Sequence, residues 1–252
     1  TRPSLRREKA ILRDDVHYLA GCDEVGRGAL AGPVSVGVVV IDATVGRVPK
    51  GRAGSKVLTA TRREALVPAI TRWVCASAVG HASPGEIDQW GLTRALRLAG
   101  MRALQGLGTT PDALLLDGSF DWLTPPHATS VDEPGLWELD DGPSAGKTLS
   151  EPAWPDLTVP PVVTQVKADL SCASVAAASV LAKTTRDAMM VELAATHPNF
   201  GWEENKGYAS EHHRDQLRVH GPCEHHRRSW RLGVAGPKAP LNGPAGGVIL
   251  QT

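Results

Sequence analysis

The most informative stretch of this chain is Gly21-Cys22-Asp23-Glu24-Val25-Gly26-Arg27-Gly28. It places two adjacent carboxylates at the end of an apolar run and follows them with a Gly-Arg-Gly turn. Neighbouring residues of a strand point to opposite faces, so both acids can reach one metal cluster only if the strand ends there. The glycines favour such an ending, and they let a ligand approach the backbone N–H groups closely.

This stretch predicts a metal site more strongly than its acids do alone. A bare Asp-Glu pair is usually a charged strand end before a tight turn, whereas the full string of eight residues is far more specific. Carboxylate oxygens are the ligands that Mg²⁺ prefers. A dinucleotide-binding turn at Gly26, Gly28 and Gly32 would require a helix to begin at the glycines. Pro33 and a Val-rich run follow instead, which excludes that alternative.

The segments around this stretch alternate between apolar strands and helical patterns. Thr61 with Glu64, and Ser83 with Glu86, have the spacing of capping boxes at helix starts. Pro68 limits the first of these helices, and Gly91 marks a break in the second. The expected strands are 16–22, 33–41, 73–81, 114–117 and 161–167, and the expected helices are 61–70, 84–107, 171–197 and 210–219.

Composition and charge are compatible with a large globular domain. The chain has 252 residues, of which 42% are hydrophobic, and 27 basic residues balance 27 acidic ones. Residues 121–156 contain eight acids and one lysine, while residues 205–233 contain six Lys or Arg, five His and three acids. An acidic segment can offset a basic face, so zero net charge does not exclude a nucleic-acid partner.

Two weaker motifs are set aside. Residues 142–148 (GPSAGKT) are similar to a phosphate-binding loop, but Asp141 replaces its first glycine, and Pro152 and Pro155 prevent the helix that must follow. The residues Cys223, His212, His213, His225 and His226 contain no Cys-x-x-Cys pair. We therefore assign these histidines to the basic face rather than to a zinc site.

In these and further motifs, the chain resembles the ribonuclease HII family, also called type 2 ribonuclease H. The resemblance covers about residues 16–230 apart from an insertion, and Gly54 departs from the usual Asp-Ser-Lys loop. The matching motifs are Asp23–Gly28, Ser55-Lys56, Glu86-Ile87-Asp88, Leu115–Gly118, Lys167-Ala168-Asp169 with the helix through Arg186-Asp187, Lys206-Gly207-Tyr208 and His226–Trp230.

The resemblance implies an α/β fold, a ribonuclease H-like mixed sheet flanked by helices, with a C-terminal helical part. It implies a catalytic domain over residues 1–232, in which 124–158 is an inserted acidic, Pro-rich loop and 198–232 is the helical part that binds substrate. We expect residues 233–252, which are rich in Gly and Pro, to form a disordered tail.

The resemblance also implies a catalytic and metal-binding set of four acids, which would hold two Mg²⁺ or Mn²⁺ ions during catalysis. From the residues alone, one acid ends a buried strand and another lies between a strand and an Ala-rich helix. Asp187 lies 18 residues beyond Asp169 (187 − 169), roughly 27 Å along a helix, so we interpret it as a structural or surface acid. The four acids are Asp23, Glu24, Asp117 and Asp169.

Six residues are expected to bind the substrate. In the family Tyr208 stacks on the sugar next to the cut and senses the 2′-hydroxyl, whereas a lone Tyr after Gly most often only packs. Arg227 and Arg228 are expected to be phosphate contacts or solvated charges. The six residues are Gly26, Arg27, Gly28, Lys56, Lys183 and Tyr208.

The implied function is an endoribonuclease that hydrolyses the RNA strand of RNA–DNA hybrids. It would also cut 5′ to single ribonucleotides in duplex DNA, leaving 5′-phosphate and 3′-hydroxyl ends, and so remove misincorporated ribonucleotides and RNA primers. A two-metal nuclease or resolvase acting on DNA, and a catalytically silent binding domain, are the alternatives. We expect a monomer with no identifiable protein partner.

The expected location is the cytoplasm. The first fifteen residues lack the apolar stretch of a signal peptide, and no apolar run is long enough to cross a membrane. The four scattered cysteines suggest reduced thiols.

Overall fold

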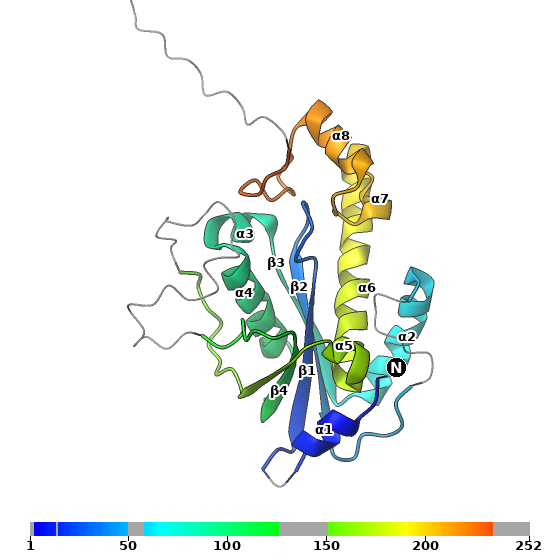
Figure 1. Ribbon diagram of the computed structural model, residues 1–252, viewed down its shortest axis with the longest axis vertical. Coiled ribbons are helices and arrows are strands. Elements are labelled where there is room, and N and C mark those ends of the chain that lie inside the picture. Colours follow the sequence, from blue (N-terminus) through cyan, green and yellow to red (C-terminus); the bar gives the residue numbers. More distant parts are fainter. Residues whose placement is uncertain (1–2, 14, 50–57, 126–150, 234–252) are drawn as a thin grey trace, which may run out of the picture.

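A five-stranded mixed sheet forms the centre of the computed structural model, which describes residues 3–13, 15–49, 58–125 and 151–233. The strands lie in the order β3-β2-β1-β4-β5 (Figure 1). Their bounds are β1 Tyr18–Val25, β2 Val34–Asp42, β3 Ala76–Ala82, β4 Ala113–Asp117 and β5 Val162–Gln165.

The strand β1 joins two kinds of pairing. It runs antiparallel to β2, which runs antiparallel to β3, and it runs parallel to β4, which runs parallel to β5. This arrangement confirms the expected mixed sheet of an α/β fold. Because parallel strands end at the same edge, the carboxyl ends of β1 and β4 lie side by side.

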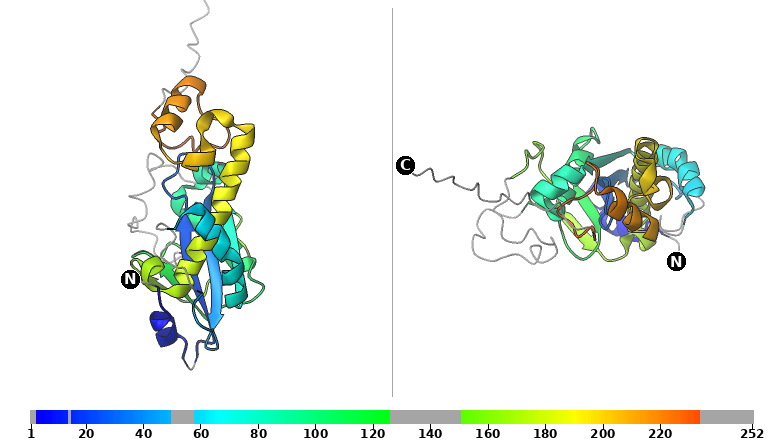
Figure 2. Two further views of the ribbon diagram at one scale, coloured as in Figure 1. Left: turned by 90° about the vertical axis from the view of Figure 1, so that its right-hand side faces the viewer. Right: turned by 90° about the horizontal axis from the view of Figure 1, so that it is seen from above.

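Helices cover both faces of the sheet (Figures 1 and 2). On one face α4 packs against β2 and β3, and on the other α6 packs against β1 and β2 with α2 outside it. The short helix α7 packs beside the C-terminal end of α6, and α8 lies above it (Figure 1). The helices are α1 Arg6–Ile11, α2 Ala60–Trp73, α3 Pro84–Trp90, α4 Leu92–Gln105, α5 Ala168–Ser171, α6 Ala173–Thr196, a 3-10 helix η4 Pro198–Phe200, α7 Trp202–Asn205 and α8 Glu211–His220.

Two strand glycines let these helices approach the sheet closely. A Cβ atom at Gly37 would lie 2.3 Å from the backbone oxygen of Ala178 in α6, and one at Gly80 would lie 2.1 Å from that of Ala99 in α4. Real Cβ atoms do not approach this closely, so any larger residue would push the helices away. The Ala-rich sequence of α6 serves the same close packing.

The apolar core is divided among several clusters. One fills the space between the sheet and α4, and two others lie between the sheet and the helices α6 and α2. A separate, smaller cluster joins the far end of α6 to the C-terminal part. Its members are Leu30, Ala31, Met190, Ala194, Phe200, Trp202, Leu217 and Leu232.

Two expectations about α2 are wrong. The helix is capped by Thr59, whose side chain accepts from the N–H of Arg62, and not by Thr61. It continues through Pro68 to Trp73, so that β3 begins only at Ala76. Pro68 is exposed, so water can bond the carbonyl that the missing N–H leaves without a helical partner.

Other local expectations are confirmed. The side chains of Ser83 and Glu86 form the expected capping box at the start of α3. Gly91, with a φ of 79°, separates α3 from α4 as expected. Among the described residues, no helix has the length and apolar composition needed to cross a bilayer.

Most of the expected insertion lies outside the described residues, as do residues 50–57 and 234–252. The described end of the insertion, residues 151–158, packs on the main core through Trp154 and Leu157. The guanidinium carbon of Arg97 lies over the Trp154 ring, 5.7 Å from the centre of that ring. This part of the predicted loop therefore belongs to the packed structure.

Candidate active site

Three acids meet at the carboxyl edge of the sheet. Cys22 of β1 is paired with Leu116 of β4, so the next residues, Asp23 and Asp117, are neighbours on adjacent parallel strands. Both side chains point to the face that α6 covers, because directions alternate along a strand and the residues two positions earlier, Gly21 and Leu115, face α6. Asp169 lies on the same face in α5, and the N–H of Ala168 donates to Asp117 Oδ1 at 2.7 Å.

The electrostatics of Asp23 show how closely the acids gather. Burial raises the pKa of Asp23 well above its ordinary value, and the charges of Glu24, Asp117 and Asp169 raise it further. A hydrogen bond from Ser179 of α6 lowers the pKa again, but by less. Carboxylates that repel one another in a buried place form an oxygen-rich donor set that fits hard divalent cations such as Mg²⁺.

Glu24 joins this group in a way the sequence did not predict. The strand β1 does not end at the acids: its pairing with β2 continues through Val25. Only the pairing with β4 stops, at Cys22. Alternation directs Glu24 to the α4 face, yet after burial it has the largest influence on the pKa of Asp23. The two carboxyl groups therefore lie close together across the edge of the strand.

Asp121 is a fifth acid near this edge, and in the sequence it stands out only as part of an acidic segment. Together with Asp23, Glu24 and Asp117 it raises the pKa of the buried Cys22 thiol, after the larger effect of burial. Its Oδ1 accepts from the backbone N–H groups of residues 123 and 124. This turn brings the chain after β4 back beside the acids.

The Gly-Arg-Gly turn is held by Arg227, which is fully buried. Its guanidinium donates to the carbonyl oxygens of Gly26 at 2.6 Å, Arg27 at 2.9 Å and Gly32 at 3.2 Å. Burial, with Arg186 nearby, lowers the pKa of Arg227 to about 9, which leaves it charged at neutral pH. The expectation that Arg227 contacts phosphate or is solvated is therefore wrong.

A second buried arginine, Arg186, links this turn to the segment that carries Tyr208. It donates to the carbonyl oxygens of Pro33, Ala31 and Lys206 at 2.8, 3.1 and 2.9 Å. Gly207 adds a backbone connection, because its oxygen accepts from residues 30 and 31. The loop before Tyr208 is thereby fixed beside the Gly-Arg-Gly turn.

The Tyr208 ring is half-buried and has two cations close to it. Lys183 Nζ is 5.6 Å from the ring centre, and the guanidinium carbon of Arg186 is 5.4 Å away. Lys183 also forms an ion pair with Asp187 at 2.6 Å, and Asp187 binds Arg63 of α2 at 2.9 Å. Asp187 is thus the structural acid that its position predicted, and Lys183 approaches Tyr208.

Two histidines assigned to the basic face are instead buried, His213 completely and His226 almost so. His226 accepts from the N–H of Cys223 through Nδ1, so its Nε2 carries the proton and donates to His213 Nε2 at 3.1 Å. His213 Nδ1 must then donate to the carbonyl oxygen of Tyr208, at 2.9 Å. This chain of neutral rings fixes the backbone at Tyr208.

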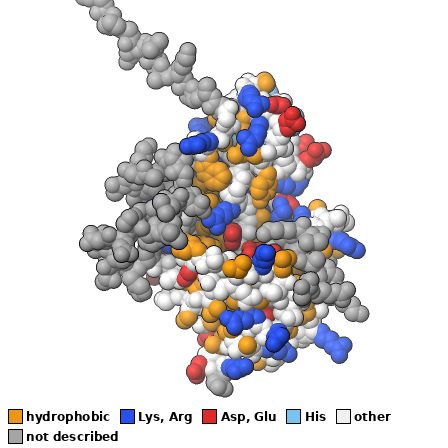
Figure 3. All heavy atoms as spheres, in the orientation of Figure 1, with side chains coloured by type: hydrophobic (Ala, Val, Ile, Leu, Met, Phe, Trp, Pro, Cys, Tyr) orange, Lys and Arg blue, Asp and Glu red, His pale blue; other side chains and the backbone are white. Residues whose placement is uncertain are grey.

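Two further expected substrate-binding residues lie at the surface. Arg27 and Gly28 are exposed, and a Cβ at Gly28 would meet no atom within 4 Å, so this turn has open space beside it. Lys56 lies outside the described residues. On the face shown in Figure 3, Lys and Arg side chains surround a small acidic group at mid-height.

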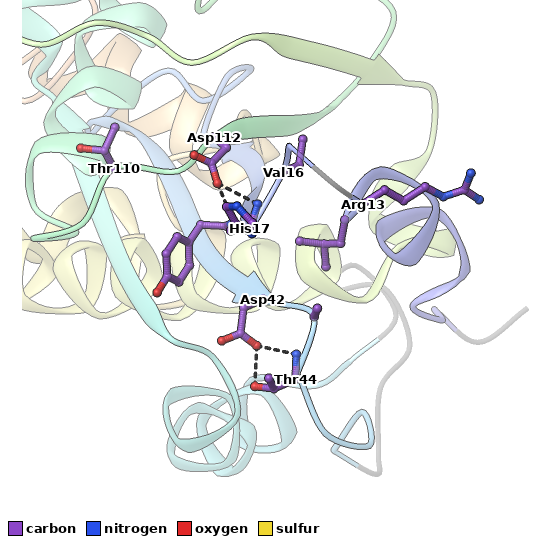
Figure 4. Close-up of a pocket in the computed structure, with 10 residues that line it drawn as sticks. Arg13, Val16, His17, Asp42, Thr44, Thr110 and Asp112 are labelled. Carbon is purple, nitrogen blue, oxygen red and sulfur yellow. Dashed lines mark hydrogen bonds between the residues drawn. The ribbon is translucent and has the colours of Figure 1, made fainter.

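A pocket at the other end of the sheet does not have these features. It lies where β1 begins and β2 ends, and it is lined by residues including Arg13, Asp42 and Asp112 (Figure 4). Asp112 accepts the backbone N–H groups of His17 and Tyr18, both at 2.8 Å. Its carboxylate therefore stabilises the start of β1.

Comparisons with known proteins agree with this geometry. A family model for ribonuclease HII matches residues 20–131 and 144–232. Ribonuclease HII of Streptomyces avermitilis is 43% identical over 212 residues, covering 84% of this chain and 76% of that protein. The protein of the same name from Paracoccus denitrificans is 41% identical over 228 residues, covering 90% of this chain and 91% of its own.

The fold also matches a solved structure. The crystal structure of ribonuclease H2 from Pyrococcus horikoshii OT3 superposes with a TM-score of 0.60 at 27% identity, covering 85% of this chain and 94% of that one. The chain therefore belongs to the ribonuclease HII family and is an enzyme of the ribonuclease H class.

Proposed function

We propose that this endonuclease hydrolyses the RNA strand of RNA–DNA hybrids and cuts on the 5′ side of single ribonucleotides in duplex DNA. It leaves 5′-phosphate and 3′-hydroxyl ends, and it removes misincorporated ribonucleotides and RNA primers. The gathering of Asp23, Asp117 and Asp169 beside Glu24 carries this proposal. The proposed catalytic set is these four acids.

The carboxylates hold the cations that the reaction needs. These residues would hold two Mg²⁺ or Mn²⁺ ions, which would supply positive charge for activating water and stabilising the departing 3′-oxygen. Ser179 orients Asp23 through its hydrogen bond, and the N–H of Ala168 orients Asp117. Both acids are thus held in place before substrate arrives, which is how electrostatic catalysis avoids reorganisation.

The turn at residues 26–28 and the Tyr208 ring recognise the ribose. The turn has open space at Gly28, and Arg227 and Arg186 hold it beside the Tyr208 loop. A sugar placed there meets backbone polar groups on one side and the ring on the other. The 2′-hydroxyl is the group that distinguishes RNA from DNA at such a place. Lys183 and Arg27 supply positive charge for the neighbouring phosphates, and Lys56 is proposed for the same role.

One assay tests this proposal. The substrates are a DNA duplex with a single ribonucleotide, the same duplex made only of DNA, and an RNA–DNA hybrid, each with and without Mg²⁺ or Mn²⁺. We expect metal-dependent cutting of the first and third, with the cut mapped to the 5′ side of the lone ribonucleotide. Equal cutting of the all-DNA duplex would instead support a DNA nuclease.

A further inference from the structure

Three ligand-bearing side chains converge at the end of α6, away from the four acids. They are His197, which follows the last residue of α6, and the adjacent pair Glu224 and His225. One ligand atom from each lies within 4.8 Å of the other two. Glu224 Oε1 lies 3.6 Å from His197 Nε2 and 3.8 Å from His225 Nε2. These separations exceed by a few tenths of an ångström the roughly 3.4 Å between ligand atoms around a tetrahedral zinc ion.

The hydrogen bonds behind His197 determine which of its nitrogens has a lone pair. The hydroxyl of Thr196 donates to the carbonyl oxygen of Leu193 at 3.1 Å. Its oxygen is 2.9 Å from His197 Nδ1, which must then be the donor in that contact. Nε2 is therefore the nitrogen with the lone pair, and it faces the Glu224 carboxylate. Two acceptors facing each other at this distance repel unless a cation lies between them.

The surroundings favour a cation as well. The carbonyl end of the 24-residue helix α6 carries a partial negative charge, and no basic residue lies in its last turn. His197 and His225 are largely shielded, with side chains 20% and 29% exposed, while Glu224 is 70% exposed. An ion has an entry path from the Glu224 side. Imidazole nitrogen suits zinc-like ions better than Mg²⁺.

We propose that His197, Glu224 and His225 form a second metal site, which binds a zinc-class divalent cation with water as the fourth ligand. The hydrogen bond from His197 to Thr196 is the outer-shell contact that orients zinc-binding histidines in general. The ion would tie the end of α6 to the segment that leads into Arg227. It is therefore a structural clamp on the C-terminal part, and it is independent of the catalytic proposal.

The test measures Zn²⁺ binding to the full chain without any affinity tag. The protein is stripped with a chelator and titrated calorimetrically with ZnCl₂ in excess Mg²⁺, which occupies the carboxylate cluster. We expect one equivalent of Zn²⁺ with a higher melting temperature, and Co²⁺ in its place should give the absorption of a tetrahedral site. Absence of a bound equivalent of Zn²⁺ overturns the proposal.

Variants locate the ion. His197→Asn and His225→Asn should each weaken Zn²⁺ binding by about tenfold or more. Glu224→Gln changes an exposed residue, so it tests the site with little risk to folding. Two control variants should still bind one equivalent of Zn²⁺. They are His220→Asn, which alters an exposed histidine of α8, and Asp117→Asn, which alters the carboxylate cluster. Wild-type affinity in His225→Asn, or loss of the equivalent in Asp117→Asn, would place the ion elsewhere.

Discussion

The carboxylate end of the sheet and the C-terminal part hold their side chains in place by different means. At the sheet, the pairing of β1 with β4 holds Asp23 and Asp117 next to each other, although their carboxylates repel each other. The C-terminal part contains no strand among its described residues and has a small core. Buried polar side chains, led by Arg186 and Arg227, set its position.

The two regions should therefore respond differently to substitution, the carboxylate end through activity and the C-terminal part through stability. Removing a carboxylate from the acid cluster should destroy activity and relieve repulsion. Removing a buried arginine should leave carbonyl oxygens without donors and destabilise the fold. Active sites commonly sacrifice stability for function in this way. Four predictions test the comparison, in order of decreasing effect.

Asp117→Asn should lower the cleavage rate by about 10³-fold or more, which corresponds to about 4 kcal/mol. The amide oxygen can still accept the N–H of Ala168, so the fold persists, and the melting temperature without metal should stay the same or rise. Single-turnover kinetics and thermal melting measure the two effects. Asp112→Asn is the matched control at the other end of the sheet, where it should reduce stability and leave the rate unchanged. Near-normal turnover of Asp117→Asn in Mg²⁺ would remove this residue from the site.

Arg227→Ala should lower the free energy of unfolding by about 3–5 kcal/mol, because three carbonyl oxygens lose a buried charged donor. Arg227→Lys should recover only part of this, since an ammonium group cannot reproduce the fork of a guanidinium. Denaturant unfolding measures both variants. Arg228→Ala changes the exposed neighbour and should cost less than about 0.5 kcal/mol. Equal costs at the two positions would contradict the role given to Arg227.

Acid should destabilise the protein through the buried histidines. Burial, and His213 beside it, lower the pKa of His226 from 6.5 to about 4. Between these values the unfolded chain binds more protons than the folded one, so stability falls as pH falls. The shift of about 2.5 units limits this loss to about 3 kcal/mol. Unfolding measured from pH 7 to 4 should show a shallower slope in His226→Gln, whereas His220→Gln should keep the wild-type slope. An unchanged slope in His226→Gln would show that His226 does not titrate in this range.

Tyr208→Ala should reduce cutting at a single embedded ribonucleotide by about tenfold more than cutting of a long hybrid. Loss of the ring leaves polar groups near the 2′-hydroxyl without a partner, at roughly 1–3 kcal/mol, and a hybrid offers many alternative registers. Kinetics on the two substrates at matched salt measure this ratio. Tyr208→Phe separates the ring from the hydroxyl, and Tyr18→Ala is the matched control on an exposed tyrosine at the start of β1. Equal losses on both substrates would assign Tyr208 to folding or general binding.

Local sequence was sufficient to predict most strands and helices, whereas the mixed sheet and the set of four acids were implied by the family resemblance. The end of β4 at Asp117 follows from a short apolar run, and the position of Asp169 follows from the break before an Ala-rich segment. The expected strand ending at Asp23 was wrong, because β1 stays paired with β2 through Val25. The helix boundaries at Ser83 and Gly91 could also be predicted from local sequence. These features depend on neighbours within a few residues, which a sequence displays directly.

The errors concern contacts between distant residues. Arg227 was expected to contact phosphate or solvent because its neighbours are charged, but its partners lie 195 to 201 residues earlier. His213 and His226 were assigned to a basic face because burial of a histidine depends on aromatic rings from other segments, here Phe200 and Trp202. Pro68 was expected to shorten α2, because sequence does not show that the carbonyl it affects faces water.

The bond from Arg227 to Gly26 has a consequence for synthesis on the ribosome. The chain grows at about 5–20 residues per second, so these two residues are made roughly 10–40 s apart. Throughout that interval the nascent protein has Asp23 and Glu24 but no guanidinium to close the turn beside them. A copy released before Arg227 keeps all four acids yet lacks the closed turn, so the turn proposed to recognise the ribose is completed only when translation reaches the last segment.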